Sequence, residues 1–188
     1  FDGNKHQPRV TVRNQLGLSL EEGRDYDIIY DGCTKDGTVG CSKVGRHQMK
    51  IVLKGNYEGA KTMSFVILPP EAANVKAVLY GHDDVKVSWK KTTGADGYYV
   101  YYKNSKDAKY SLWKKTTAVS MKIANLRDGE SYRFKVIPYF KDDQNQIHKS
   151  VKYTSCICKT MEEVTLKSVK KAAGKQVKLT WRSLSGID

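Results

Sequence analysis

The residue types that carry out catalysis are present in this sequence, but their spacing forms no catalytic pattern. The histidines His6, His47, His82 and His148 are spread over the whole chain. No GxSxG turn, HExxH helix or Ser, His and Asp order accompanies them, as nucleophilic or zinc-assisted hydrolysis would require. We therefore expect no enzyme activity, no catalytic residue and no cofactor.

Pairs of adjacent acids are a second possible source of chemistry. They occur at Glu21-Glu22, Asp83-Asp84 and Asp142-Asp143, each in a turn-like context that predicts a solvated loop. The oxygens of Asp142-Asp143-Gln144-Asn145 could hold Ca²⁺ weakly, but their spacing fits no defined calcium loop. No metal site is predicted.

The four cysteines fall into two close pairs. Cys33 and Cys41 flank the turn-rich stretch TKDGTVG, so a disulfide between them would staple a hairpin loop, with a gain of roughly 2 to 3 kcal/mol. Cys156 and Cys158 share one face of a predicted strand, about 6.6 Å apart by the strand rise, which is at the strained limit for a disulfide. We expect the second pair to be free, half-buried thiols. Neither pair has the partners that a zinc site needs.

The charge of the chain is strongly basic, with a formal net charge of +13. The lysines are dispersed along alternating segments, and neither a groove-binding helix nor an RNA-binding signature is present, so nucleic acid is not the expected partner. An extracellular or cell-surface polyanion fits this charge better. The sequence holds no apolar run long enough to insert in a membrane. Because no signal peptide is visible and Phe1 is not an initiator methionine, we expect an excised or processed piece.

Three segments must position these residues. Residues 1–70 alternate apolar and polar positions in short runs separated by Gly, Asn and Asp turns, which predicts a β-sandwich or barrel. The expected strands are Val10–Val12, Asp27–Tyr30, Met49–Leu53 and Met63–Ile67. The stretch LPPEAA follows, and its paired prolines predict a fairly stiff connection to the next domain.

Residues 71–160 predict a second all-β domain. Seven strands are expected, near Val75–Tyr80, Val85–Lys90, Tyr98–Lys103, Tyr110–Lys115, Ser120–Ile123, Tyr132–Phe140 and Lys149–Lys159. In LRDGESYRFKV, a Leu, a Gly turn and a Tyr that opens an alternating strand are the pattern of a tyrosine corner. Leu126 and Tyr132 are therefore predicted to pack in the core with Trp89.

The last segment, residues 161–188, repeats the start of the second domain. VKVSW at Val85–Trp89 returns 92 positions later as VKLTW at Val177–Trp181, and Gly94 and Asp96 return as Gly186 and Asp188. Because two strands cannot bury a sandwich core, we expect these residues to be the first two strands of a truncated second copy. The sequence predicts tandem β-sandwiches cut from a longer array.

Residues 71–160 resemble a fibronectin type III domain over their full length. The resemblance is carried by Trp89, Tyr98, Val100, Leu126, Gly129, Tyr132, Phe134 and Val136. It implies that the strands holding Tyr98 and Tyr132 are neighbours. The loop that carries Arg-Gly-Asp in some members reads KDDQNQ here, so integrin binding is not expected.

Residues 1–70 resemble a bacterial immunoglobulin-like repeat of secreted and wall-attached proteins of Gram-positive bacteria. The matching positions are Phe1, Gly3, Pro8, Gly23, Asp25, Tyr26, Gly55, Asn56, Tyr57 and Gly59. The insertion from Cys33 to Cys41 departs from that pattern. The resemblance implies an extracellular, secreted or wall-attached protein.

One face of the second domain is a candidate ligand surface. With Tyr98 and Val100 inward, strand alternation turns the next residues outward, and the same count applies to the strand of Tyr132. The outward set is Tyr99, Tyr101, Arg133, Lys135 and Tyr139. Its rings could stack on sugars while its cations hold sulfate, carboxylate or phosphate groups. Alternatively, cross-strand Tyr/Lys pairs stabilise the sheet, or the face packs on a neighbouring domain.

The sequence thus favours a non-catalytic extracellular spacer whose partners are neighbouring domains of the same chain. Two alternatives stay open. One is an adhesion module that binds an anionic or host-surface polysaccharide, and the other is an accessory module of a secreted hydrolase.

Overall fold

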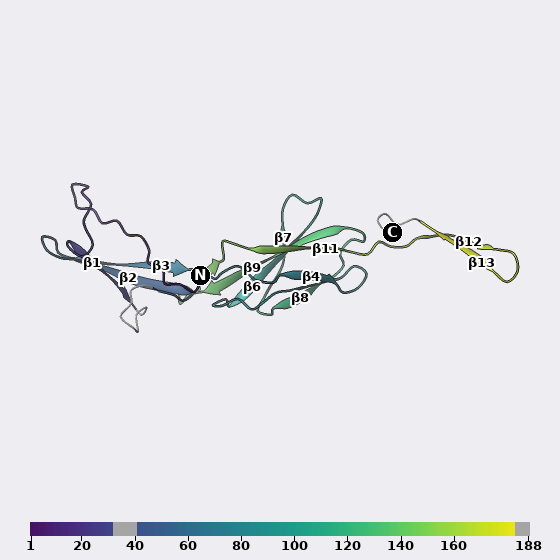
Figure 1. Cartoon of the computed structure of the whole chain (residues 1–188), viewed down its shortest axis with the longest axis horizontal. Coiled ribbons are helices and arrows are strands. Elements are labelled where there is room, and N and C mark those ends of the chain that lie inside the picture. The colour runs from purple at the N-terminus through teal and green to yellow at the C-terminus, as the bar shows by residue number, and fades with distance from the viewer. Residues whose placement is uncertain (32–40, 183–188) are drawn as a thin grey trace.

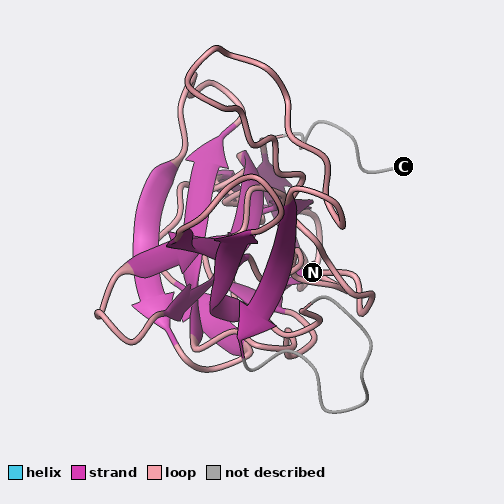
Figure 2. Cartoon of the chain, turned by 90° about the vertical axis from the view of Figure 1, so that its left-hand side faces the viewer, coloured by secondary structure: helices cyan, strands magenta, loops and turns pink. Residues whose placement is uncertain are grey.

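The computed structural model describes residues 1–31 and 41–182. These residues form thirteen strands, β1 to β13, and no helix. Figure 1 shows three units that follow one another along the long axis of the molecule, and every described element in Figure 2 is strand or loop. The all-β prediction is confirmed.

The first module, residues 1–68, is built on one antiparallel sheet in the order β1-β2-β3. Its strands are β1 (Tyr26–Asp31), β2 (Gly45–Leu53) and β3 (Ala60–Ile67). One face of the sheet is buried in a small cluster that includes Tyr30, Met49 and Ile67, with Val10 packed against it. The opposite face carries polar residues, among them Gln48 opposite Ser64 and Lys50 opposite Thr62.

The predicted strand Val10–Val12 is wrong. This segment instead enters a local turn in which the Asn14 side chain accepts hydrogen bonds from the amides of Leu16 and Leu18, each at 3.0 Å. The Leu20 amide then donates to the Val12 carbonyl at 2.8 Å. An Asn side chain that satisfies backbone donors competes with strand pairing, so irregular chain rather than a second sheet covers this side of the first module.

The second module, residues 71–160, is a two-layer β-sandwich. One layer has the order β4-β5-β8, and the other has the order β10-β9-β6-β7 with β11 also paired to β9. The bounds are β4 (Lys76–Leu79), β5 (Val85–Ser88), β6 (Gly97–Asn104), β7 (Ser111–Thr116), β8 (Ser120–Ile123), β9 (Ser131–Lys141), β10 (Ile147–Lys149) and β11 (Thr154–Lys159).

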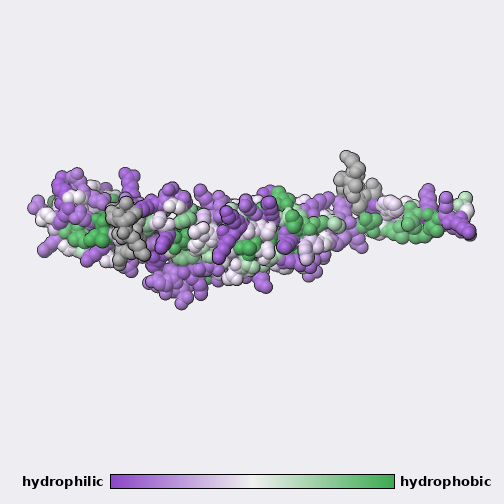
Figure 3. Space-filling view, turned by 60° about the horizontal axis from the view of Figure 1, so that its bottom comes forward, coloured by the Kyte–Doolittle hydropathy of each residue, from purple (hydrophilic) through white to green (hydrophobic). Residues whose placement is uncertain are grey.

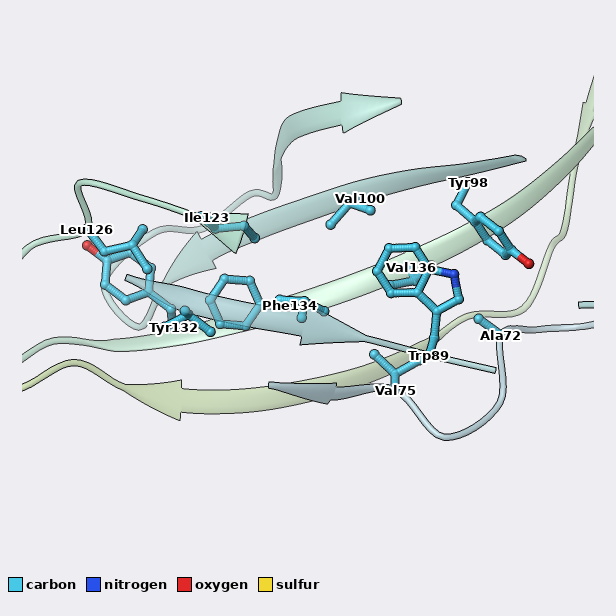
Figure 4. Packing of buried hydrophobic residues seen from close by; sticks show 12 residues of the cluster. Ala72, Val75, Trp89, Tyr98, Val100, Ile123, Leu126, Tyr132, Phe134 and Val136 are labelled. Carbon is cyan, nitrogen blue, oxygen red and sulfur yellow. The ribbon is translucent and has the colours of Figure 1, made fainter. Parts of the chain in front are cut away.

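The core of the second module lies between these two layers (Figure 4). Val85 and Val87 come from one layer and Val100 and Phe134 from the other, and all four are fully buried. Trp89 packs edge-on against Tyr98 with ring centroids 5.2 Å apart. Leu126 and Tyr132 belong to the same cluster.

Two buried tyrosine hydroxyls bind backbone amides across loops. The Tyr132 hydroxyl accepts the Arg127 N–H at 3.0 Å, which forms the tyrosine corner. The Tyr98 hydroxyl accepts the Thr92 N–H at 2.8 Å in a fully buried setting. Each bond satisfies a donor that no strand ladder reaches, so both tyrosines tie a loop to the core.

The predicted last strand, Lys149–Lys159, is split in two. β10 pairs with Tyr139 to Lys141, whereas β11 pairs with Ser131 to Val136. Pro138 lies between these two stretches of β9, and proline has no N–H with which to continue a ladder. The Pro138 carbonyl instead accepts the Ser150 N–H at 2.9 Å, at the point where the chain leaves β10.

The third unit is a hairpin of β12 (Leu166–Lys171) and β13 (Val177–Trp181). These strands pair only with each other among the described residues. Gly186 and Asp188, which the repeat pattern includes, lie outside the described residues.

Candidate functional site

The predicted ligand residues lie on the outer face of the sheet β10-β9-β6-β7. Tyr99 pairs with Ile137 and Tyr101 pairs with Lys135 across β6 and β9, so these residues share one side of the sheet. We call this surface the tyrosine face. It is the side opposite to Tyr98, Val100 and Phe134, which are buried.

Lys135 is the centre of one group on the tyrosine face. Its Nζ lies 4.2 Å from the ring centroid of Tyr110, 4.7 Å from that of Tyr153 and 4.9 Å from that of Tyr101. Burial lowers the pKa of Lys135 from its ordinary value. An ammonium over several ring faces gains cation–π attraction that partly replaces lost water. The Lys135 side chain therefore packs among these tyrosine rings and does not extend into solvent.

Tyr99 and Tyr139 form a second group. Their rings meet edge-to-face at 5.1 Å, with Lys149 Nζ 3.9 Å from the Tyr99 centroid and Lys115 Nζ 4.3 Å from the Tyr139 centroid. The expectation that Tyr139 is exposed is wrong, since only 5% of its surface is accessible. It points outward by alternation, but Tyr99 and Lys115 cover its ring.

The tyrosine face is positively charged. Five cations lie along it, and within the described residues none of them makes an ion pair with a carboxylate. They are Lys103, Lys115, Arg133, Lys135 and Lys149. Arg133 is exposed and lies opposite Lys103 on β6 and Ile157 on β11. Such a surface attracts anions over the range of the Debye length.

The sequence did not reveal Tyr110, Tyr153, Lys115 and Lys149 as members of this face. They come from β7, β10 and the residues just before β7 and β11, and their register against β6 and β9 cannot be read from one sequence. The lysines occupy the ring faces on which a sugar would stack, so cross-strand Tyr/Lys pairing describes the geometry of this surface.

A second polar site joins the first module to the second. Arg46, on the outer face of β2, donates from Nε to Asp142 Oδ2 at 2.9 Å and from a terminal nitrogen to Gln146 Oε1 at 3.0 Å. Its other terminal nitrogen donates to Ser64 Oγ on β3 at 3.1 Å. We call these residues, with His148, the junction.

Asp142 is the buried member of the junction. Its side chain has no accessible surface, whereas that of Arg46 is 20% accessible. Oδ1 accepts the backbone amides of Gln144 and Gln146, and Oδ2 lies 2.8 Å from His148 Nε2. The solvated loop predicted for Asp142 is therefore wrong, because groups of its own loop and strand, together with Arg46 of the first module, surround this carboxylate.

Electrostatics at the junction favour the ionised carboxylate. Burial alone opposes the charge of Asp142, but hydrogen bonds from His148, the Gln146 amide and Arg46 outweigh it and hold the pKa of Asp142 well below its usual range. Four donors around a buried carboxylate keep it ionised and also hold its side chain in one orientation. The junction thus sets the orientation of the β9–β10 loop against β2.

An apolar contact lies beside this ion pair. A Cβ placed on Gly94, in the β5–β6 loop, would clash with the Val44 side chain in the first module. Gly94 also has a φ of +71°, in the left-handed region that favours glycine. Two loops at one end of the second module therefore touch the first module.

The cysteines of the described residues differ in oxidation state. Cys41 is disulfide-bonded. Cys33 lies outside the described residues, so the Cys33–Cys41 pairing stays a prediction. Cys156 and Cys158 are free and half-buried, as expected. Burial, with a smaller effect from Cys158, raises the pKa of Cys156 to about 11.

Comparisons with known proteins give only structural likenesses. A scan of protein families and a search of curated proteins both find no match. Among solved structures, "FN3tt mut" has a TM-score of 0.42 and 19% identity over 51% of this chain and 100% of that chain. FN3tt has a TM-score of 0.41 and 16% identity, over 52% of this chain and 98% of that chain. The twitchin kinase region from C. elegans has a TM-score of 0.40 and 17% identity, over 53% of this chain and 18% of that chain.

These TM-scores lie below 0.5, so the fold rests on the sheet order given above. That order is a fibronectin type III or immunoglobulin-like β-sandwich. Across residues 1–31 and 41–182, no helix could span a membrane. The same residues contain no group of three or more His, Cys, Asp or Glu side chains placed to hold a metal ion.

Proposed function

We propose that this chain is a non-catalytic spacer in an extracellular protein of a Gram-positive bacterium, in which tandem β-domains hold other domains at a fixed distance. The observation that carries the proposal is the junction. A flexible tether would need no buried carboxylate between its domains, whereas here Arg46 of the first module supplies a charged partner to Asp142, which has no accessible side-chain surface.

The connection between the modules supports the same function. Leu68 to Ala73 contains Pro69 and Pro70, which restrict the backbone, and Ala72 is fully buried in the core of the second module. Figure 1 shows the modules end to end. The extracellular setting is supported by the sequence resemblance of residues 1–70 to wall-attached repeats.

The spacer proposal predicts that length and stiffness matter, but surface chemistry does not. In the full-length protein, residues 1–160 are replaced by an unrelated rigid two-domain segment of equal length, and the activity of the flanking domains at the cell surface is measured. Retained activity supports the spacer. If the equal-length replacement loses activity as completely as a deletion does, the spacer proposal is wrong.

A second candidate function is binding of an anionic polysaccharide by the tyrosine face. The observation that favours it is the set of five cations without a paired carboxylate in the described part of the chain. A sulfated or uronate-containing chain could bind these cations while its sugars contact the parts of the Tyr99 and Tyr101 rings that Lys149 and Lys135 leave uncovered. Such a module could act in adhesion or as an accessory to a secreted hydrolase.

The two candidates separate in one experiment. Tyr99, Tyr101 and Lys135 are replaced by serine, and retention on a sulfated-glycan column is compared with wild type over a salt gradient. A spacer keeps its surface display whether or not these residues are present. If the tyrosine face binds glycans, the wild-type protein is retained at low salt and the variant elutes at a lower salt concentration. If the wild-type protein is not retained at low salt, this candidate is ruled out.

A further inference from the structure

The hairpin β12–β13 has one apolar face that nothing covers in the described residues. Val177, Leu179 and Trp181 alternate onto one side of β13, and Val169 lies directly opposite Leu179 while Leu166 lies opposite Trp181. These five side chains are 51% to 61% exposed. Figure 3 shows the hydrophobic surface that they form at one end of the molecule.

The other face of the hairpin is polar. Lys178 pairs with Lys170 and Thr180 pairs with Ser168, whereas Lys171, opposite Val177, is the one polar residue paired on the apolar side. This pattern is typical of a strand pair with one side in a core and the other in water. A two-stranded sheet is at best marginally stable alone, and this one is built to be covered on one side.

The second module shows what covers such a face. The residues that match Val177, Leu179 and Trp181 are Val85, Val87 and Trp89, 92 positions earlier. Their exposed fractions are 0%, 0% and 5%. The same residue pattern is therefore buried in one copy and open to solvent in the other.

The cover in the second module is the inner face of the sheet that holds β6 and β9. Tyr98 packs edge-on against Trp89, and Val100, Phe134 and Val136 complete the opposing layer (Figure 4). An opposing layer of this kind presents alternate aromatic and β-branched side chains from central antiparallel strands.

We propose that the apolar face of β12–β13 is the docking surface for a sheet of the β6/β9 kind, contributed by the polypeptide that follows Asp188 in the full-length protein. The sequence match extends past β13: Gly186 and Asp188 take the places of Gly94 and Asp96, and Gly97 begins β6 directly after Asp96. The occupant is thus the rest of a third β-sandwich, and Trp181 is its core anchor. This inference does not rest on the spacer function.

The test compares this chain with the full-length protein by acrylamide quenching of tryptophan. Trp113→Phe is made in both, because Trp113 is partly exposed, and the full-length protein is read with and without Trp181→Phe to isolate the Trp181 signal. We expect Trp181 to be readily quenched in residues 1–188 and protected several-fold in the full-length protein. Equal quenching in both overturns the proposal.

A matched pair of variants tests the face itself. Leu179→Asp places a charge on the apolar side, and Thr180→Asp places the same charge on the polar side of the same strand. In the full-length protein, Leu179→Asp should abolish the protection of Trp181 while Thr180→Asp keeps it, and the unfolding transition of the second module should not move in either. Equal behaviour of the two variants contradicts the proposal.

A second copy of the chain is the competing occupant. If Trp181 in residues 1–188 becomes protected as protein concentration rises, together with formation of a dimer in sedimentation, the face docks to another copy and the proposal is wrong. A monomer with a quenchable Trp181 at every concentration agrees with it.

Discussion

Removal of the Tyr98 hydroxyl from the core of the second module should lower the free energy of unfolding, because the hydroxyl is a buried hydrogen-bond acceptor. In Tyr98→Phe the ring stays in place against Trp89, but the Thr92 N–H loses its acceptor at 2.8 Å. Thr92 is 95% buried, with only 5% of its surface exposed, so water does not replace the hydroxyl freely. A buried donor without a partner costs about 1–3 kcal/mol, and we expect a loss of this size in the free energy of unfolding.

Two other Tyr→Phe variants give destabilisations with which that of Tyr98→Phe can be compared. Tyr132→Phe removes a similar bond to the Arg127 N–H at 3.0 Å, but that site is only partly buried, so water can replace part of the bond and we expect about 1 kcal/mol. Tyr101→Phe changes the outer tyrosine face and should stay within about 0.5 kcal/mol of wild type. The predicted order of destabilisation is therefore Tyr98→Phe, then Tyr132→Phe, then Tyr101→Phe.

The assay is urea unfolding followed by the fluorescence of Trp89, in a background where Trp113 and Trp181 are phenylalanine. This background reports the second module alone, because Trp89 lies in its core. If Tyr98→Phe is no more destabilising than Tyr101→Phe, the Thr92 amide does not depend on the Tyr98 hydroxyl, and the reasoning from buried hydrogen bonds fails.

Three further predictions concern the core, a thiol and the junction. In urea unfolding, Trp89→Ala should lower the free energy of unfolding of the second module by about 3–5 kcal/mol. Trp181→Ala in residues 1–188 should leave the urea midpoint of the second module unchanged. Cys156, with a pKa raised to about 11, should react slowly with iodoacetamide at neutral pH and faster as the pH approaches that value, as mass spectrometry would show; rapid reaction at neutral pH would contradict this. The pKa of Asp142 is lowered in the folded protein, so its ionised form contributes fully to stability above the ordinary Asp value of 3.8, and this contribution declines as the pH falls from there through the lowered folded pKa. The NMR signal of Arg46 Nε–H should therefore stay constant from neutral pH down to about 4 and shift only in stronger acid. A shift near neutral pH would contradict this prediction.

Strand positions in the second module could be predicted well from the sequence, because alternation is strong there. Ser120–Ile123 matches β8, and most other strands differ from their predictions by a residue or two at the ends. The failures have local causes. Pro138 interrupts the ladder that a continuous last strand would need, and Asn14 diverts the chain after Val12 into a turn. Neither effect is visible in a count of apolar and polar positions.

The candidate sites were harder to predict. Alternation places Tyr99, Tyr101 and Lys135 on one side of the sheet, yet it says nothing about the side chains that cover them, and Tyr139 is buried for that reason. The junction joins Arg46 to Asp142, residues 96 positions apart in different modules. Asp142 looks like any loop acid in the sequence, because its burial depends on the fold of its own loop and on Arg46 of the other module.

The central claim, that the two modules form one stiff unit, is tested most directly by the distance distribution across the junction. Spin labels are placed at Lys61 and Lys86, which are exposed on β3 and β5, after Cys156 and Cys158 are changed to serine. We predict one narrow distance by pulsed electron paramagnetic resonance, which Arg46→Ala broadens and the control Lys50→Ala, on the same face of β2, leaves narrow. A wild-type distribution as broad as that of Arg46→Ala would contradict the account.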